Sequence, residues 1–401
     1  MDLLRHSQHI GFDTLPTDRP WRVKLGMDPT APDLHLGHAV LLRKMRQFQD
    51  AGHLGVLVVG SFTAQIGDPT GKNKTRPPLT SQQVASNAST YIEQAFKILD
   101  PAKTEVVHND AWLGALSAVE LTQLMAKVTV SQLMARDDFS QRAAANEPIA
   151  LHELLYPVLQ GMDSVHLHAD IELGGRDQWF NLHMGRALQE KHGQPPQALL
   201  AMPLLVGLDG VHKMSKSLDN HIGLAMDPVE SFGRWMSVSD TTMWTMLPLL
   251  DVWDDDRIAT ERDACFNGLR NPMDVKMDAG LALLTLLHGV QSARDAQDAF
   301  LAKHRNKTHE FDTVVREFPP GTSLPVILRQ LGFADSNMDA ARKMAQGGVR
   351  VDGVKVIDKA TVLGAGSHRI EVGKRQGCNL QLTIAPVALD SSGLSPMDAA
   401  S

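Results

Sequence analysis

The chain reads WRVKLGMDPTAPDLHLGHAVLLRKMRQFQDAGHLGVLVVG from Trp21 to Gly60, and this segment indicates the class of its fold. Residues 21–27 predict a short strand, two prolines mark the turn after it, and a helix follows. The helix is indicated by apolar residues at the spacing i, i+4 and i+7, which are Leu41, Met45 and Phe48. Asp33 is its expected N-cap, and the apolar run 54–59 predicts the next strand. Strand, helix and strand in about 40 residues form a βαβ unit, so we expect an α/β fold with a parallel sheet covered by helices.

The α/β pattern continues to residue 228, which we take as the end of a first domain, residues 1–228. Residues 165–172 alternate strictly between apolar and polar side chains, which predicts a strand with one polar face. Asp177 is the expected N-cap of a helix that ends at Lys191. Residues 199–206 predict a further buried strand.

The chain changes character after residue 228. Helix-period segments without strand runs predict a helical domain over residues 229–320, and the sequence Phe318-Pro319-Pro320-Gly321 marks its end. Residues 321–388 predict a small α+β module with short strands. Residues 389–401 are rich in Ser, Ala and Asp and predict a disordered tail.

Length and composition exclude several classes of protein. The chain has 401 residues, of which 43% are apolar and 21% charged, as expected for a folded protein of two or three domains. Its longest nearly uncharged apolar stretch, residues 198–208, is far shorter than the roughly 20 residues that span a bilayer, and the N-terminus lacks the apolar core of a signal peptide. Two cysteines, Cys265 and Cys378, are too few for a disulfide framework or a CxxC site. We therefore expect a cytoplasmic protein with no membrane contact.

The net charge of −7 argues at face value against a nucleic-acid partner. The charge is unevenly distributed, however, because residues 322–385 contain nine Lys and Arg against five Asp and Glu. This basic excess predicts nucleic-acid contact confined to the C-terminal module and to the active-site loops.

The first candidate site is His35-Leu36-Gly37-His38, at the start of the first helix. Histidines at i and i+3 share one face of the first helical turn, beside unpaired backbone N–H groups and the positive end of the helix dipole. This arrangement favours a phosphate site, and Gly37 allows a flat ring or a ribose to approach the backbone. The alternative is a pair of solvated or capping histidines. A position at the carboxyl end of a parallel strand favours the nucleotide site.

The second candidate is Lys213-Met214-Ser215-Lys216-Ser217, in the loop after the strand 199–206. Two lysines three residues apart, with small hydroxyls between them, form a mobile clamp for a polyphosphate. Taken alone, such a charge run is as readily a solvated loop. HLGH after the first strand and KMSKS after a late strand together resemble the double signature of the class I aminoacyl-tRNA synthetases.

A third pattern is Tyr156, Gln160 and Asp163 at i, i+4 and i+7, which on a helix form one stripe. Polar groups in line on a buried stripe indicate a pocket that hydrogen-bonds a ligand, and the alternative is an ordinary amphipathic surface. Pro157 and Gly161 weaken the helix prediction.

Four ordered blocks extend the resemblance over nearly the whole chain. Residues 26–38, 66–72, 156–164 and 174–178 resemble the bacterial tyrosyl-tRNA synthetases, the last block matching their GGxDQ turn. Residues 322–385, with AARK at 340–343 and QGGVRVDG at 346–353, resemble an S4-type RNA-binding domain, with which that family also ends. The resemblance implies a Rossmann-like catalytic domain, a helical anticodon-binding domain and an S4-like domain.

The implied activity is that of a tyrosine–tRNA ligase, which forms tyrosyl-adenylate and pyrophosphate from tyrosine and ATP and then transfers the tyrosyl group to the 3′ end of tRNA(Tyr). The catalytic residues would be Thr30, His35, His38, Lys72, Arg76, Lys213 and Lys216. The tyrosine-binding residues would be Asp68, Tyr156, Gln160, Asp163 and Gln178. The ATP-binding residues would be Gly26, Asp28, Gly37, Gly174, Gly175, Asp177 and Lys216.

The resemblance also implies ATP as a substrate with Mg²⁺ on its phosphates, no prosthetic group and no protein cage for a metal. A homodimer is implied, with an insertion at 110–155 near the interface. His166 and His168 fall on one face of the predicted strand, but no compact third ligand follows them, so we discount a zinc site.

Three residues depart from the family pattern. Lys24 stands two residues before Gly26, where the better-known branch has a tyrosine that holds the substrate hydroxyl. Met162 stands where an aromatic residue is usual, and Ser61 where an acid is expected. Two rival functions therefore stay open, a synthetase for another aromatic amino acid and a catalytically inactive RNA-binding paralogue.

Overall fold

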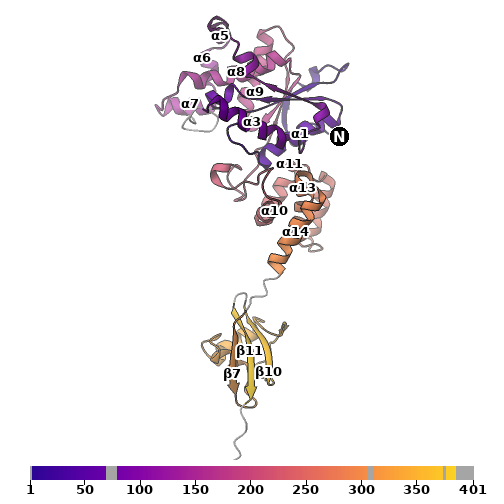
Figure 1. The fold of residues 1–401 in the computed structure, drawn as a ribbon, viewed down its shortest axis with the longest axis vertical. Helices are drawn as coiled ribbons and strands as arrows, with labels where there is room; N and C mark the ends of the chain where they lie inside the picture. Colours follow the sequence, from indigo (N-terminus) through magenta and orange to yellow (C-terminus); the bar gives the residue numbers. More distant parts are fainter. Residues whose placement is uncertain (1, 69–78, 306–310, 374–375, 385–401) are drawn as a thin grey trace, which may run out of the picture. The chain divides into compact units, whose positions relative to one another are not determined.

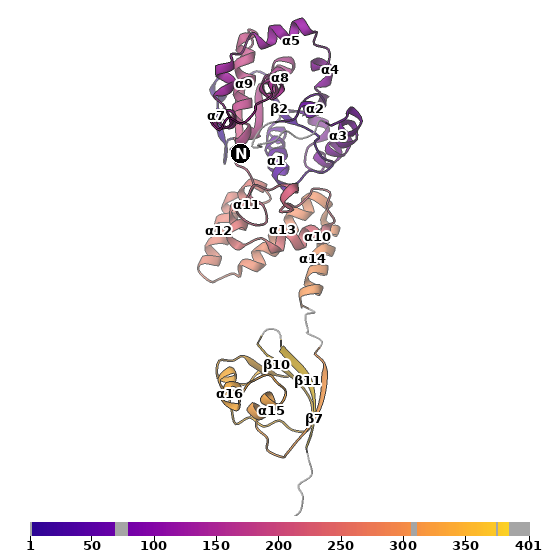
Figure 2. The same ribbon diagram turned by 90° about the vertical axis from the view of Figure 1, so that its left-hand side faces the viewer.

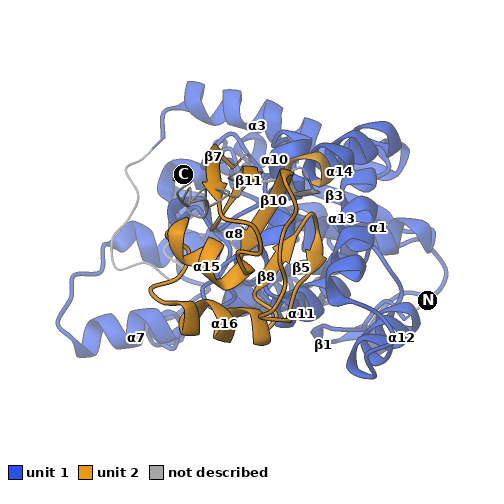
Figure 3. Cartoon of the chain, turned by 90° about the horizontal axis from the view of Figure 1, so that it is seen from below, with its two compact units in different colours: residues 1–300 blue, residues 301–401 orange. Residues whose placement is uncertain are grey.

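The computed structural model describes residues 2–68, 79–305, 311–373 and 376–384. The chain forms two compact units, residues 1–300 and 301–401 (Figure 3). Each unit has its own sheet, and we describe the two separately.

Unit 1 is built on a six-stranded sheet with the strand order β1-β6-β5-β2-β3-β4. The strands are β1 (Gln8–Ile10), β2 (Arg22–Met27), β3 (Leu54–Val59), β4 (Thr104–His108), β5 (Ile171–Gly175) and β6 (Ala198–Met202). All neighbours are parallel except β1, which runs antiparallel to β6. Strands β5 and β6 are buried along their whole length, as expected for a parallel sheet between helices. The predicted α/β class is confirmed.

The predicted βαβ unit is present as β2, α1 (Leu36–Asp50) and β3. The helix begins slightly later than expected, because the N-cap is His35 and not Asp33. Of the three apolar residues that predicted it, Met45 and Phe48 are fully buried and Leu41 is partly buried.

The other helices of the sheet region follow β3 and precede β6 along the chain (Figures 1 and 2). They are α2 (Thr63–Ile66), α3 (Ser81–Ala95), α4 (Asp110–Leu113), α5 (Ala118–Met125), α6 (Val130–Met134), α7 (Asp137–Ala144), α8 (Leu151–Leu167) and α9 (Trp179–Lys191). Helices α8 and α9 pack side by side, and α4 to α7 make up most of the segment 110–155.

The predicted strand over residues 165–172 is wrong. Helix α8 continues to Leu167, His168 ends it in the left-handed conformation (φ 48°), and β5 begins only at Ile171. Val165 is buried in an apolar cluster with Leu159 and Leu188, which explains why the helix extends this far. The alternation spans a helix end, a turn and a strand start, so it has no single structural origin. The next strand is also shorter than predicted, since β6 ends at Met202.

Helices follow from residue 228 to residue 305. They are α10 (Pro228–Ser237), α11 (Asp240–Leu250), α12 (Asp255–Phe266), α13 (Pro272–His288) and α14 (Val290–Arg305). Helix α10 packs on α13 through Gly280, where a Cβ atom would lie 2.6 Å from the buried Trp235 ring. The predicted helical character of this region is therefore present in the structure.

Unit 2 contains a five-stranded sheet with the order β7-β11-β10-β8-β9 and two helices. Its elements are β7 (Thr313–Phe318), α15 (Leu324–Gln330), α16 (Asn337–Ala345), β8 (Val349–Val351), β9 (Val354–Lys355), β10 (Gly366–Val372) and β11 (Gln376–Ile384). Strand β7 pairs in parallel with β11, and Phe318 joins the core of this unit. The predicted boundary at 320/321 therefore falls too late, because residues 313–318 read locally as the end of the helical region and find their partner only at the far end of the chain. The predicted tail, 389–401, lies outside the described residues.

Candidate active site

The candidate residues gather where β2, β3 and β5 end, at the carboxyl edge of the parallel sheet. Parallel strands carry their following loops to the same edge, which is where α/β folds bind ligands. Gly26 lies near the end of β2, an interior strand, yet it is exposed, and no atom lies within 4 Å of the place where a Cβ would be. Its neighbours Leu25 and Met27 are buried. The structure thus leaves an opening over Gly26.

One wall of this opening is formed by Asp28 and Tyr156. The Tyr156 hydroxyl donates to Asp28 Oδ2 (2.8 Å), and the Thr63 hydroxyl donates to Asp28 Oδ1 (2.7 Å). Burial raises the pKa of Asp28 to about 7, against the effect of these two hydrogen bonds. Gly60 must lack a side chain, because a Cβ there would lie 1.9 Å from Asp28 Oδ1. Thr30 follows in the same turn, its backbone N–H donating to the Asp28 carbonyl oxygen (2.8 Å).

Asp163 is a second carboxylate in this region, since its charge acts on Asp28, and it is only 3% exposed. Trp112 Nε1 donates to its Oδ1 (2.9 Å) and Asn109 Nδ2 to its Oδ2 (3.3 Å). Burial raises the pKa of Asp163 to about 6, and the charge of Lys24 is the largest effect that lowers it. Sequence reasoning missed Asn109 and Trp112. The available signal was that Asn109 directly follows β4, at the same sheet edge as the other site residues.

Lys24 and Glu172 form a buried ion pair beside Asp163, with 2.9 Å between Nζ and Oε1. The Lys24 ammonium also donates to Ser164 Oγ (2.8 Å) and to the Gln160 carbonyl oxygen (3.2 Å), both on α8. The Gln160 side chain donates to Glu172 Oε1 (3.3 Å). The polar residues predicted to share one helix face, Tyr156, Gln160 and Asp163, therefore all lie on α8. Asp163 is buried, and the Gln160 side chain points toward the ion pair.

Asp68 and Gln178 are in direct contact, with Gln178 Nε2 donating to Asp68 Oδ2 (2.8 Å). Arg136 lies 3.9 Å from the other Asp68 oxygen. Ser61, which stands where an acid was expected, donates to Asp110 Oδ1 (2.6 Å), so a carboxylate from α4 reaches this position instead. Lys72 and Arg76 lie outside the described residues.

The two histidines of HLGH are held as neutral rings. His35 Nδ1 accepts from the Gly37 backbone N–H (3.1 Å), and His38 Nδ1 accepts from the His35 backbone N–H (3.2 Å). Burial is the main cause that lowers the pKa of His35 to about 2 and that of His38 to about 4, and the charges of Lys213 and Lys216 contribute to both shifts. A neutral imidazole that accepts at Nδ1 carries its proton at Nε2. Each ring therefore keeps one N–H donor besides its capping bond, while Gly37 is required because a Cβ would lie 2.9 Å from the His35 ring.

The KMSKS loop lies against the HLGH segment. Backbone bonds join Leu36 N to the Ile222 oxygen (3.0 Å) and Leu224 N to the Leu34 oxygen (2.9 Å). Lys216 Nζ donates to the Asp33 carbonyl oxygen, and Lys213 Nζ pairs with Asp177. Met214 is buried and anchors the loop. The two motifs, far apart in the sequence, thus place two ammonium groups near two imidazole donors.

The glycines of the GGRDQ segment are required by close packing. A Cβ on Gly175 would lie 2.6 Å from Asp177 Oδ1, and one on Gly174 would lie 3.2 Å from the Leu182 side chain. Asp177 lies in a 3-10 turn, Arg176–Gln178, and it does not cap α9 as expected, because α9 begins two residues later at Trp179 with Gln178 as its N-cap. Its carboxylate instead holds Lys213 at the opening.

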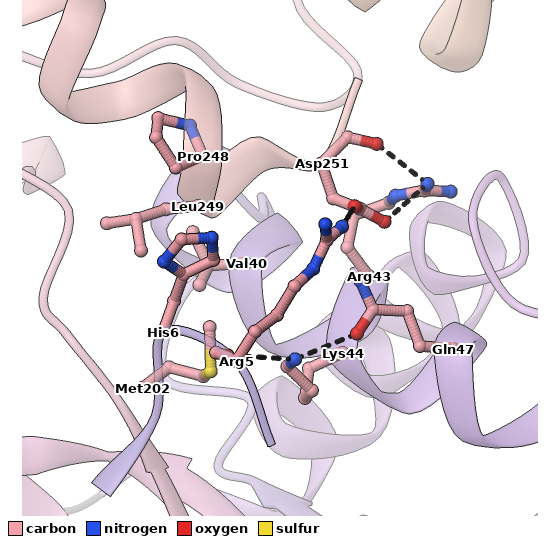
Figure 4. A pocket seen from close by; sticks show the side chains of 10 residues that line it. All are labelled: Arg5, His6, Val40, Arg43, Lys44, Gln47, Met202, Pro248, Leu249 and Asp251. Atoms are coloured by element: carbon pink, nitrogen blue, oxygen red, sulfur yellow. Dashed lines mark hydrogen bonds and ion pairs between the residues drawn. The ribbon is translucent and has the colours of Figure 1, made fainter. Parts of the chain in front are cut away.

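Two other features have structural explanations. His166 lies on α8 and stacks on Trp112 with 4.4 Å between ring centroids, and within the described part of the chain no group of three His, Cys, Asp or Glu is arranged to hold a metal. A small cavity between the N-terminal segment, α1 and α11 is lined by charged residues that pair with one another, Asp251 with Arg5 and Arg43 (Figure 4). We assign this cavity a structural role. Among the described helices, none has the length and apolar character needed to cross a membrane.

Comparison with known proteins decides the family. The sequence profile described as tRNA synthetases class I (W and Y) matches residues 16–302. The chain belongs to the class I tRNA synthetases. It is 50% identical over 368 residues to the tyrosine–tRNA ligase of Thiobacillus denitrificans, covering 91% of this chain and 93% of that one. It is 46% identical over 373 residues to the tyrosine–tRNA ligase of Methylococcus capsulatus, covering 92% and 94%.

Solved structures agree on the fold of this synthetase. The mitochondrial tyrosyl-tRNA synthetase of Coccidioides posadasii superposes with a TM-score of 0.60 at 19% identity, covering 73% of this chain and 88% of that one. The tyrosyl-tRNA synthetase of Archaeoglobus fulgidus in complex with L-tyrosine superposes with a TM-score of 0.56 at 22% identity, covering 70% and 91%. At these identities the likeness shows the fold alone.

Proposed function

We propose that this chain is a tyrosine–tRNA ligase, which activates L-tyrosine with ATP and transfers the tyrosyl group to tRNA(Tyr). The observation that carries the proposal is the pairing of a class I synthetase fold with relatives named tyrosine–tRNA ligase that are 46–50% identical over more than nine-tenths of the chain. The open space over Gly26 supports it, together with the hydrogen-bonded carboxylates Asp28 and Asp163.

The tyrosine substrate would lie over Gly26 with its phenol hydroxyl donating to Asp163. That carboxylate is held by two N–H donors and still has lone pairs for a third. The α-ammonium group would be held by Asp68, Tyr156, Gln160 and Gln178, which offer carboxylate, hydroxyl and amide oxygens. A site built around a hydroxyl rejects an analogue without it, because its own groups would be left unpaired; rejection of phenylalanine by tyrosyl-tRNA synthetases is itself the well-known example of this principle.

ATP would lie across HLGH and KMSKS. Gly26, Gly37, Gly174 and Gly175 would admit the nucleoside, Asp28 would line the nucleotide path, and Asp177 would accept from the ribose hydroxyls after releasing Lys213. The phosphates would meet Thr30, the Nε2–H donors of His35 and His38, and the ammonium groups of Lys213 and Lys216. Lys72 and Arg76 are also proposed to bind the phosphates, on the sequence alone. ATP would arrive with Mg²⁺ on its phosphates.

The first step needs positioning and charge stabilisation and no general base. The tyrosine carboxylate, already ionised at neutral pH, attacks the α-phosphorus; a carboxyl O–P bond forms, the bond to the bridging oxygen breaks, and pyrophosphate leaves. Neutral histidine donors and lysine ammonium groups stabilise the charge that develops on the phosphates. In the second step a ribose hydroxyl of the terminal adenosine of tRNA attacks the acyl carbon, and AMP leaves.

The tRNA would contact the basic C-terminal module, residues 322–385, as well as the active-site loops. We also propose a homodimer in the cytoplasm with its interface near the segment 110–155. This segment exposes large apolar side chains, with Val119 65% and Val130 66% exposed, and Leu151 at the start of α8 80% exposed. Sedimentation of the purified protein tests the dimer.

Amino-acid-dependent ATP–pyrophosphate exchange with a panel of amino acids tests the function. The proposal expects exchange with tyrosine and little with tryptophan or phenylalanine. Exchange with tryptophan alone would identify a synthetase for another aromatic amino acid. No exchange with any amino acid, while tRNA is still bound, would identify the inactive RNA-binding paralogue.

A further inference from the structure

Lys24 is completely buried, with an exposed fraction of 0%, on the strand that forms the floor of the opening. Its ammonium group has three donors, and the structure pairs it with three acceptors, Glu172 Oε1, Ser164 Oγ and the Gln160 carbonyl oxygen. A saturated ammonium group has no donor to spare for a ligand. Lys24 therefore does not replace a hydroxyl-binding tyrosine by contacting the substrate itself.

The contacts of Lys24 are instead with the turn of α8 that carries Asp163. Gln160 and Ser164 lie three residues before and one residue after Asp163 on that helix, and Glu172 on β5 is 1% exposed. Glu172 is held in turn by Ser164, which donates to Oε2 (3.0 Å), and by Gln197. The ion pair thus links β2 and β5 to the turn of α8 that carries Asp163.

The hydrogen bonds around Asp163 favour its carboxylate anion. Each of its two oxygens accepts an N–H donor, from Trp112 and from Asn109. Protonation would leave one of these N–H donors with a weaker, neutral hydroxyl acceptor, whereas the anion accepts strongly from both. Since burial of Asp163 disfavours its charged form, a neighbouring positive charge adds to these hydrogen bonds in keeping it ionised.

We propose that Lys24 and Glu172 act as a positioning pair for hydroxyl recognition, in which the Lys24 charge keeps Asp163 an anion aimed at the substrate hydroxyl and Glu172 moderates that charge. This inference rests on the proposed function, because it assumes that the hydroxyl bound by Asp163 is that of tyrosine. In this proposal the residue of β2 acts on the substrate hydroxyl through the charge of Asp163, and it does not contact the hydroxyl directly.

The charged groups that act on Asp163 come from several elements. Lys24 of β2 favours its ionised form and Glu172 of β5 opposes it. The charge of Asp163 in turn raises the pKa of Asp28, after β2, and of Tyr156, on its own helix. Trp112 and Asn109 are neutral donors. Among these groups Lys24 supplies the positive charge that acts on Asp163, and its effect on the Asp163 pKa exceeds the opposite effect of Glu172.

The test measures the Kd of L-tyrosine by equilibrium dialysis from pH 5 to pH 8.5 on the full chain. Tyrosine itself has no group that titrates around pH 6, so a break in log Kd there reports on the protein. In the wild type we expect tighter binding above a break near pH 6, the pKa of Asp163. Asp163→Asn removes the titrating group and should abolish that break.

Two variants should move the break in opposite directions. Lys24→Met/Glu172→Gln removes both charges together, so neither is stranded in the core, and it should raise the break by about one pH unit. A shift of that size weakens binding about threefold at pH 6.5 and leaves it nearly unchanged at pH 8.5. Glu172→Gln alone leaves the Lys24 charge and should lower the break.

A purely structural role for the pair would weaken binding equally at every pH, with the break unmoved. That result, or shifts of both variants in the same direction, would overturn the proposal. If the double variant does not fold, Glu172→Gln alone decides, since its downward shift is the outcome that a packing defect does not produce. Wild-type protein that binds no tyrosine at any pH would reject the proposed function itself, which is a separate result.

Discussion

Replacing Gly26 by alanine tests where the substrate lies. The substitution adds one methyl group to β2, at a place where no protein atom lies within 4 Å of the new carbon. The backbone of Gly26 already has extended geometry in the paired strand, opposite Val58 of β3. We therefore expect no overpacking in the free protein, and stability that is unchanged or raised by up to about 1 kcal/mol, because alanine has less conformational entropy to lose than glycine.

The effect on the bound substrate should be large. A ligand that rests on the strand at van der Waals distance lies about 3.5–4.0 Å from the Gly26 Cα. The new methyl carbon projects about 1.5 Å from that Cα, so the ligand has to move away by a similar distance. Misplacement of reacting groups by about 1 Å lowers rates about 100-fold. We expect kcat/KM for tyrosine in ATP–pyrophosphate exchange to fall about 100-fold in Gly26→Ala.

The assay combines exchange kinetics with denaturant unfolding of the same preparations. Gly60→Ala is the matched control, because its Cβ would lie 1.9 Å from Asp28 Oδ1 and the protein itself has to give way. That variant should lose about 1–3 kcal/mol of stability as well as activity. Full activity in a stable Gly26→Ala protein would refute the placement of the substrate over Gly26. A loss of stability above about 1 kcal/mol would refute the premise that the space is open.

Three further predictions concern the phosphate end, the histidines and the C-terminal unit. Lys216→Ala should slow tyrosyl-adenylate formation at least tenfold with little change in tyrosine affinity, measured by single-turnover kinetics and dialysis, and equal losses in both would contradict its assignment to the phosphates. The pKa values of His35 and His38 are lowered in the folded state, so the unfolded chain binds more protons than the folded one between pH 4 and 6.5. Each histidine therefore lowers the stability by about 1.6 kcal/mol from pH 6.5 to pH 5, and His35→Asn/His38→Asn should lose less stability than the wild type between these two pH values, measured by urea unfolding. The raised pKa values of Asp28 and Asp163 act in the opposite direction in both proteins, so an identical loss in the variant would contradict the assignment of buried neutral histidines. A chain that ends at Arg305 should keep pyrophosphate exchange but bind tRNA more weakly, and the remaining tRNA affinity should depend less on salt concentration, measured by filter binding. Unchanged tRNA affinity would exclude a role for the basic module.

The features that could be predicted from the sequence are those that depend on residues close together in the chain. The strands β2 and β3 with α1 between them follow from apolar spacing and flanking glycines and prolines, and they are present as predicted. HLGH, KMSKS and GGRDQ could be recognised for the same reason, since each is a short run whose chemistry lies in its own side chains. The class I fold and the family both follow from them.

Local patterns failed where the partner of a segment is distant. Residues 165–172 alternate like a strand, but burial of Val165 against Leu188 extends the helix through them. Residues 313–318 look like the end of a helical region until β11 pairs with them. In both cases long-range packing outweighs the local preference, because the apolar area and the ladder hydrogen bonds become available only in the folded chain.

The sequence by itself determined the fold class, the family and the residues that carry its signatures. Only the tertiary structure decided how those residues act on one another. It joins the HLGH segment to Ile222 and Leu224, which follow KMSKS, through backbone bonds. It also gives Asp163 its donors Asn109 and Trp112, and it pairs the buried Lys24 with Glu172. The physical reason is that charge state and hydrogen-bond direction depend on burial and on neighbours from other strands, and neither quantity is present in a local run of residues.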